Sequence, residues 1–161
     1  MDKIKDKIKK IKEKNENNQH KKEKLITEMT IHEEDLNQIF LEDSDRLDIR
    51  NFTKLNGMTI NIYESEGTIP HFHLEKPSSN FYSAIRLDDA KYFRHNKYQD
   101  TLNSNQRKAL YKFLKQPMDE KRNKDFTRWD HLVVMWNSTI RHGHNKNYCD
   151  TIVMPNYREL E

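Results

Sequence analysis

Three short segments near the middle of the chain, each alternating between apolar and polar residues, constrain the fold more than any other feature. They span residues 58–63, 69–75 and 81–87. A period of two is typical of β-strands that bury one face. The connections between the segments are too short for a crossover, so the three strands are expected to form an antiparallel meander. A weaker extended segment is predicted at 90–93.

Helical patterns flank these strands on both sides. Thr30 and Glu33 have the spacing of a capping box, which predicts a helix over about 31–41. A second helix is predicted from residue 103 or 104 to about 116, and Pro117 ends it. A polar connection is expected to follow that proline.

The strongest helical face lies in the last third of the chain. Thr127 and Asp130 provide an N-terminal capping signal. The apolar residues that follow have the spacing i, i+3, i+4, i+7 and i+11, and they are Trp129, Leu132, Val133, Trp136 and Ile140. The predicted fold class is α+β: a small antiparallel meander of three to four strands, with C-terminal helices packed on one face and a helical N-terminal extension.

Residues 1–24 differ in composition from the rest of the chain. They hold ten lysines and five acidic residues, a net charge of +5, whereas the whole chain carries +3. Ile4, Ile8 and Ile11 recur at i, i+4 and i+7, a narrow helical stripe that could dock on the body of the protein or pair with a partner helix. We therefore expect a basic, partly helical or disordered extension over 1–24 and a single α+β domain over 25–161. Such an extension can contact nucleic acid by counterion release, although it has no arginine and no aromatic residue for specific recognition. The alternative is a solvated extension without a partner.

Cysteine content and hydropathy exclude several classes of protein. Cys149 is the only cysteine, so an internal disulfide framework is excluded and a reducing compartment is favoured. No apolar run reaches the roughly 18–20 residues of a membrane span. The N-terminal residues also lack the apolar stretch that is typical of a signal peptide. A cytoplasmic protein without membrane contact is predicted.

The second strand carries the most distinctive motif, in which His71, His73 and Glu75 alternate with Phe72 and Leu74. In an extended strand the two histidines and the glutamate share one face. That face is expected to be polar and semi-exposed, because antiparallel sheets commonly have one solvated side. Alternation in the neighbouring strands adds Asn61 and Tyr63 to it. The predicted binding face consists of His71, His73, Glu75, Tyr82 and Arg86; the alternative is a solvated surface or a structural hydrogen-bond network.

The main expectation is that the protein has no cofactor. The alternative is a divalent metal such as zinc, bound at the same face. His71 and His73 could supply two ligands. Glu75 would lie roughly 13 Å along the strand from His71, so a third ligand must come from elsewhere. A second group, His142, His144 and Cys149, has loose metal-ligand character but lacks a Cys-x-x-Cys half.

The His-x-His strand partly resembles that of the histidine-triad nucleotide hydrolases, which carry three alternating histidines after a glycine. Gly67 precedes His71 here, and Glu75 stands where the third histidine would be. In that family the middle histidine attacks the phosphate, which corresponds to His73. This resemblance implies the alternative function: a small hydrolase of phosphate-containing substrates that uses His71 and His73 as nucleophile or metal ligands. No complete catalytic constellation is present in the sequence. The sequence therefore favours a binding protein over an enzyme and leaves both alternatives open.

A broader resemblance is to a group of small bacterial and phage proteins with a Pro-His-x-His-hydrophobic-Glu strand. It covers about residues 57–157, and it is carried by the segments 67–75, 86–88, 102–104 and 154–157. The resemblance implies a small cytosolic accessory protein of the mobile-element or toxin–antitoxin-associated type, or an inhibitor of a host system. It implies no reaction.

The resulting functional prediction is a binding or regulatory protein. It would engage a protein or nucleoprotein partner through the His-bearing sheet face, through the basic N-terminal helix, or through both. The sequence leaves the partner and the oligomeric state open.

Overall fold

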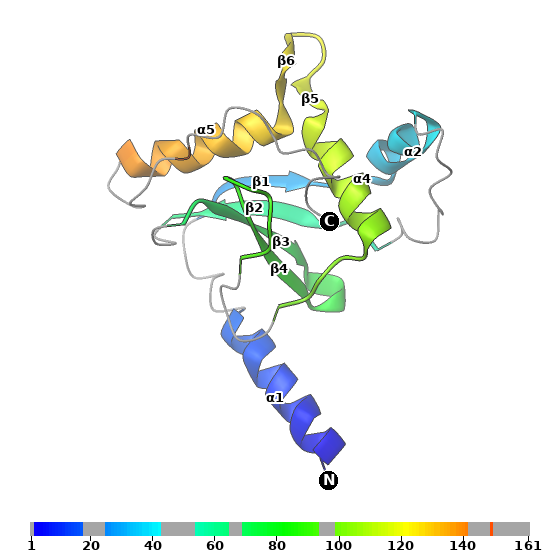
Figure 1. The fold of residues 1–161 in the computed structure, drawn as a ribbon, viewed down its shortest axis with the longest axis vertical. Coiled ribbons are helices and arrows are strands. Elements are labelled where there is room, and N and C mark those ends of the chain that lie inside the picture. Colours follow the sequence, from blue (N-terminus) through cyan, green and yellow to red (C-terminus); the bar gives the residue numbers. More distant parts are fainter. Residues whose placement is uncertain are drawn as a thin grey trace.

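The computed structural model describes residues 2–17, 25–42, 54–64, 69–93, 99–141 and 149. It has the α+β architecture expected from the sequence (Figure 1). In chain order the elements are α1 (Asp2–Asn17), β1 (Leu25–Thr30), α2 (Glu33–Glu42), β2 (Thr59–Tyr63), β3 (His71–Lys76), the 3-10 turn η2 (Pro77–Ser79), β4 (Phe81–Arg86), α4 (Ser104–Lys115), β5 (Pro117–Asp119), β6 (Asn123–Thr127) and α5 (Arg128–Arg141).

The main sheet contains four antiparallel strands in the order β1-β2-β3-β4. The three predicted strands are therefore confirmed as a meander. The fourth strand is β1, which the sequence analysis did not predict, while the weak segment at 90–93 forms only a bridge between Tyr92 and Ile85. A register shift between Leu25 and Thr27 interrupts the alternation of β1, which explains why its pattern was missed.

The strand register confirms which side chains share a face. Ile60 lies opposite Leu74, and Phe72 lies opposite Ile85, so the apolar residues of three strands meet on one side. On the other side His73 lies between Asn61 of β2 and Ala84 of β4. Gly57 adopts a φ of +79° at the turn before β2, a conformation that favours glycine.

The helices begin and end for identifiable reasons. α4 starts with a full capping box, in which the Asn103 side chain accepts from the Gln106 backbone and the Gln106 side chain accepts from the Asn103 backbone. The predicted cap at Thr30 is wrong. Thr30 ends β1, and Asp35 accepts a hydrogen bond from the backbone of His32, just before α2. The expected polar connection at 117–127 is instead the β5–β6 hairpin, whose short exposed strands carry no apolar alternation.

The core lies between the apolar sheet face and the helices. Trp129 and Trp136 of α5 are fully buried, as the helical pattern predicted. The Trp129 ring meets Phe72 of β3 edge to face, with 6.3 Å between centroids. Arg128 joins three elements: its guanidinium stacks 4.0 Å from the Phe113 ring of α4 and lies 3.3 Å from the Asp35 carboxylate of α2.

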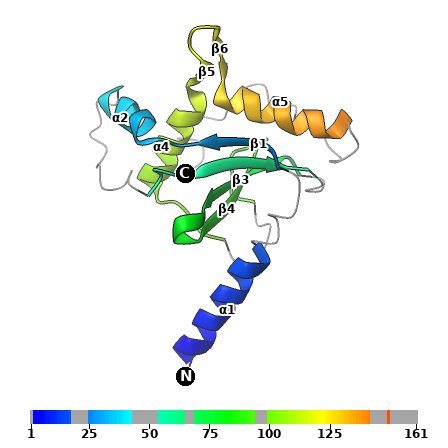
Figure 2. The ribbon, with the colours of Figure 1, turned by 180° about the vertical axis from the view of Figure 1, so that it is seen from behind.

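Two segments extend from this body at opposite ends. α1 points away from the sheet, and the β5–β6 hairpin projects at the other end (Figures 1 and 2). The three isoleucines of α1 keep much of their surface exposed: 65% for Ile4, 49% for Ile8 and 51% for Ile11. Within the part of the chain that the structure describes, no helix combines the length and the apolar character needed to cross a bilayer.

Candidate functional site

The part of the predicted face that carries His71 and His73 is buried, which corrects the expectation of a semi-exposed surface there, whereas Glu75 and Arg86 are partly exposed. His71 is 1% exposed and His73 is fully buried. The rings of Phe93 and Trp136 lie 4.8 and 5.4 Å from the His71 ring. The backbone of Phe93 also donates to the Ala84 carbonyl, so the chain after β4 folds back along the sheet. Nothing in the local pattern of β3 indicates such a cover.

Helix α5 contributes to both sides of β3. Trp129 packs against Phe72 on the apolar face, while Trp136 packs against His71 on the polar face. Both tryptophans belong to the apolar helical face predicted from the sequence, but that pattern did not predict a contact with a histidine. The part of the polar face that carries His71 and His73 is therefore in the interior of the protein.

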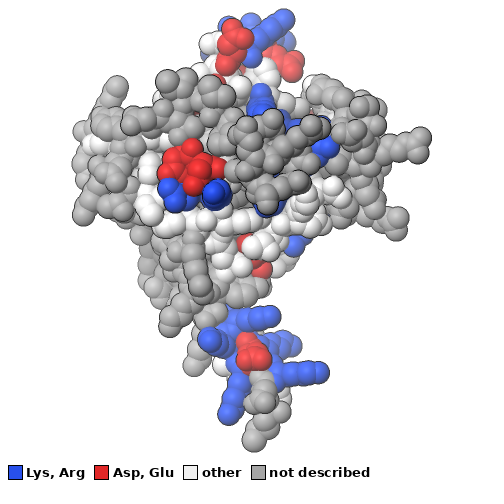
Figure 3. Space-filling view, in the orientation of Figure 1, with Lys and Arg blue, Asp and Glu red and all other residues white. Residues whose placement is uncertain are grey.

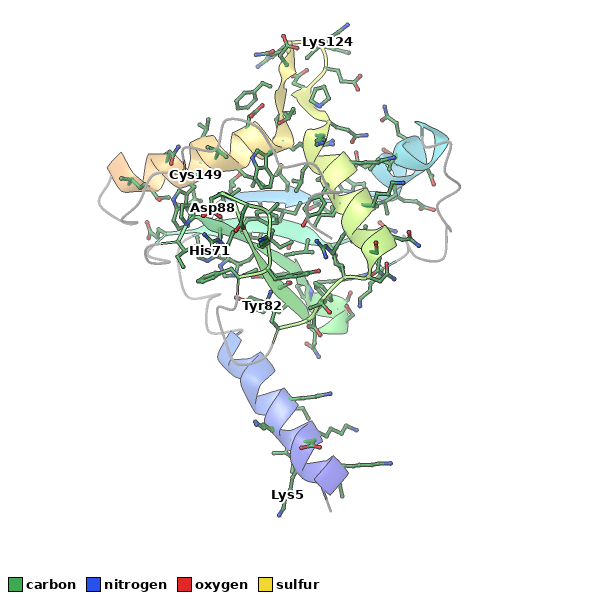
Figure 4. All side chains as sticks on the ribbon, viewed as in Figure 1. Lys5, His71, Tyr82, Asp88, Lys124 and Cys149 are labelled. Carbon is green, nitrogen blue, oxygen red and sulfur yellow. The ribbon has the colours of Figure 1, made fainter. Side chains whose placement is uncertain are left out.

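A continuous hydrogen-bond chain runs through the two histidines. The Tyr82 hydroxyl lies 2.9 Å from Nδ1 of His73. Nε2 of His73 lies 3.2 Å from Nε2 of His71, and Nδ1 of His71 lies 2.6 Å from the carbonyl oxygen of Ile69. His71 and Tyr82 are labelled in Figure 4. The chain links the start of β3 to β4 through buried polar atoms.

The hydrogen bond between His71 and the Ile69 carbonyl determines which atoms donate and which accept along this hydrogen-bond chain. The Ile69 carbonyl can only accept, so Nδ1 of His71 carries a hydrogen. With both rings neutral, Nε2 of His71 then accepts from Nε2 of His73, and Nδ1 of His73 accepts from the Tyr82 hydroxyl. In that neutral state the two histidines hold opposite tautomers. One hydrogen fits between the facing Nε2 atoms and two do not.

Glu75 belongs to a separate group with two residues of β2. The Tyr63 hydroxyl donates to the Glu75 carboxylate at 3.1 and 3.2 Å, and the Asn61 amide lies 3.4 Å from it. Burial raises the pKa of the Tyr63 hydroxyl, and the charge and hydrogen bond of Glu75 raise it further. The carboxylate therefore pairs with side chains of β2.

Arg86 lies opposite His71 in the register, yet its charged group is engaged elsewhere. Its guanidinium binds the Asp88 carboxylate through two nitrogens and lies 3.5 Å from Asp89. The hydrogen bond and charge of Arg86 hold the pKa of Asp88 below its usual value, although partial burial opposes this. Arg86 is thus a charged residue at the margin of the face.

The two histidines have part of the geometry of a metal site. Two imidazole nitrogens bound to one tetrahedral zinc ion are separated by about 3.3 Å, given Zn–N distances of about 2.0–2.1 Å. The observed 3.2 Å is similar. Among the described residues, however, no group of three or more His, Cys, Asp or Glu side chains could hold a metal ion.

The second predicted metal group is only partly visible. His142 and His144 lie outside the described residues. Cys149 is buried, and its backbone exchanges two hydrogen bonds with the Asn137 side chain of α5, at 2.8 and 3.1 Å. The metal assignments for His142, His144 and Cys149 therefore stay predictions.

Helix α1, which points away from the sheet, has an exposed surface that is both apolar and basic. The side chains of residues 3–11 in α1 are all exposed. They comprise five lysines, one aspartate and the three isoleucines. Figure 3 shows the lysines spread along α1, away from the body, and Figure 4 labels Lys5 there. An apolar stripe flanked by positive charge is thus exposed along α1.

Comparison of the chain with protein-family models, with curated proteins and with solved structures finds no match.

Proposed function

We propose that this protein is a binding module that captures a partner protein through α1. The observation that carries the proposal is the exposure of Ile4, Ile8 and Ile11, at 65%, 49% and 51%. Fully burying one isoleucine side chain contributes about 1.5–3 kcal/mol. Roughly half of that is still available at each of the three positions, so a partner that covers the stripe would gain several kcal/mol, about 2–5.

The spacing of the isoleucines supports a protein partner. Anchors at i, i+4 and i+7 are typical of an amphipathic helix that lies in a groove. Nucleic acid offers phosphates to the lysines but no apolar surface to the stripe, and α1 has no arginine or aromatic residue for base contacts. A protein groove uses both properties of the helix.

The burial of the histidines supports a structural role for them rather than catalysis. A phosphate substrate would have to reach His73, which is fully buried and hydrogen-bonded to Tyr82. One cavity among the described residues lies elsewhere, between α2, α4 and β5, and its lining includes Lys112 and Lys115. The contacts of His71 and His73 therefore favour the binding function over the hydrolase.

The proposed role is regulatory. The resemblance of residues 57–157 to small bacterial and phage proteins implies an accessory protein of a mobile element or of a toxin–antitoxin system, or an inhibitor of a host system. In each of these settings a compact body that presents one docking helix would bring the body to the partner.

The test compares capture by three forms of the full chain. One form carries Ile4→Ser, Ile8→Ser and Ile11→Ser, and a matched control carries Lys3→Ser, Asp6→Ser and Lys10→Ser. A captured protein should be identified, purified and titrated against each form. We expect the isoleucine variant to lose binding while the control retains it. Equal affinity of the isoleucine variant and the native chain would overturn the proposal.

A further inference from the structure

The three isoleucines of α1 have the spacing of apolar positions in a heptad pattern. The isoleucines are separated by four and then three residues, which is the spacing of the d, a and d positions. In this register Ile8 occupies position a, and Ile4 and Ile11 occupy position d. All three are exposed in a helix that runs without interruption from Asp2 to Asn17.

Charges are sorted around this seam. The positions that flank an a/d seam are e and g, and here both sides carry lysine only: Lys5, Lys7, Lys12 and Lys14. The acidic residues of α1 fall on the far positions b and f: Asp2, Asp6, Glu13 and Glu16. A helix that is basic merely for solubility has no need to separate its charges in this way. The seam is therefore apolar with positive charge on both sides.

This arrangement opposes pairing with a second copy of the chain. In a parallel pair of helices, g of one faces e of the other, and in an antiparallel pair e faces e and g faces g. Every such contact between two copies of α1 would place lysine against lysine. Like charges at these positions act against an unwanted partner, so they select a different one.

We propose that α1 binds an apolar groove with acidic residues on both rims, on a partner protein of different sequence, and that the flanking lysines exclude a second copy. This inference rests on the proposed function and names the chemistry of the partner. Three isoleucines form a short seam, and a groove covers it from both sides whereas a single helix covers only one. Charge complementarity at both rims then keeps the isoleucine seam turned toward the groove.

A designed helical hairpin is a suitable probe, because it can present a leucine-lined groove with chosen rims. Three versions carry glutamate, glutamine or lysine on the rims and are otherwise identical. Calorimetric titration of the full chain should give roughly tenfold weaker binding for glutamine rims than for glutamate rims, and no measurable binding for lysine rims. Affinity for the glutamate version should fall as the salt concentration rises.

Two charge variants of the chain make the test specific to the seam. Lys5→Glu with Lys7→Glu reverses two of the four flanking charges, and Lys3→Glu with Lys10→Glu makes the same change in net charge at position c. The flank variant should lose the preference for glutamate rims over lysine rims, and the control variant should keep it.

The possible results separate the two proposals. If the Ile→Ser variant binds the glutamate hairpin as well as the native chain does, the proposed function fails. If binding needs the isoleucines but is indifferent to the rim charge, only the present inference fails. Self-association of the native chain that depends on Ile8 would also overturn it. So would tighter binding to phosphatidylserine vesicles or to duplex DNA than to the glutamate hairpin.

Discussion

The buried hydrogen-bond chain makes a quantitative prediction for Tyr82→Phe. The change removes one hydroxyl, which donates to Nδ1 of His73 at 2.9 Å, and keeps the ring in place. His73 cannot recover by changing tautomer. Moving its hydrogen to Nδ1 would leave its Nε2 lone pair facing that of His71, whose own hydrogen is held on Nδ1 by the Ile69 carbonyl.

The cost follows from the burial of the acceptor. His73 is fully buried, so solvent water does not replace the lost hydroxyl as a donor to Nδ1. Losing the partner of a buried polar group costs about 1–3 kcal/mol, and we expect about 2 kcal/mol in the free energy of unfolding. For a chain of this size such a loss lowers Tm by about 4–8 °C.

A double-mutant cycle separates this cost from the general effect of the substitution. In a His73→Leu background, Tyr82→Phe leaves no buried acceptor without a donor. The loss in free energy of unfolding caused by Tyr82→Phe should therefore be smaller by at least about 1 kcal/mol. The matched control is Tyr111→Phe, which removes another buried hydroxyl that donates to the Ala90 carbonyl at 2.7 Å. Its cost should be the same with and without His73→Leu.

Urea unfolding followed by circular dichroism measures all of these free energies, and the fluorescence of Trp136 is avoided because its ring touches His71. Nitrogen NMR of the native protein should also show hydrogen on Nδ1 of His71 and on Nε2 of His73. The reasoning is refuted if the Tyr82 and His73 changes add to within about 0.5 kcal/mol, or if both rings have the same tautomer.

The remaining predictions concern the core, a titrating histidine and an ion pair. Phe72→Ala should cost about 3–5 kcal/mol in urea unfolding, because it empties a fully buried site; a cost under about 1 kcal/mol would contradict the packing. Burial lowers the pKa of His131, whose Nε2 lies 3.1 Å from the Thr27 hydroxyl. The unfolded chain then binds more protons, so this contribution to stability is complete above pH about 6.5 and is lost as the pH falls toward the lowered pKa. Accordingly, His131→Gln should flatten the rise in unfolding free energy between pH 5 and 7, and an unchanged slope would argue against it. Arg128→Met should cost about 2–3 kcal/mol, since it removes the partner of Asp35 and the charged hydrogen bonds to α4; near-native stability would show that these contacts contribute little.

Much of the sheet could be predicted because its pattern is local. Alternation in β2, β3 and β4 placed Asn61 and Tyr82 on the same face as His73, and the register confirms this. The helical spacing of Trp129 and Trp136 likewise predicted two buried residues of α5. In each case the period of the backbone decides where a side chain points, whatever surrounds the element.

The features that were missed depend on contacts between distant parts of the chain. β1 has an interrupted alternation, and it becomes an edge strand because β2 offers it a partner. Arg86 shares the face of His71 by register, but Asp88, two residues away, takes its guanidinium. Competition between possible partners is settled only when the folded chain brings them together.

The sequence by itself determined that His71 and His73 share one face of a strand, and that α1 carries an isoleucine seam between lysines. Both conclusions follow from the fixed periods of strand and helix. Only the tertiary structure decided that the histidines are interior. Phe93 and Trp136 cover His71 from positions about 20 and 65 residues further along the sequence, which the period of the strand does not reveal. Burial depends on what covers a face, and that is a property of the whole fold.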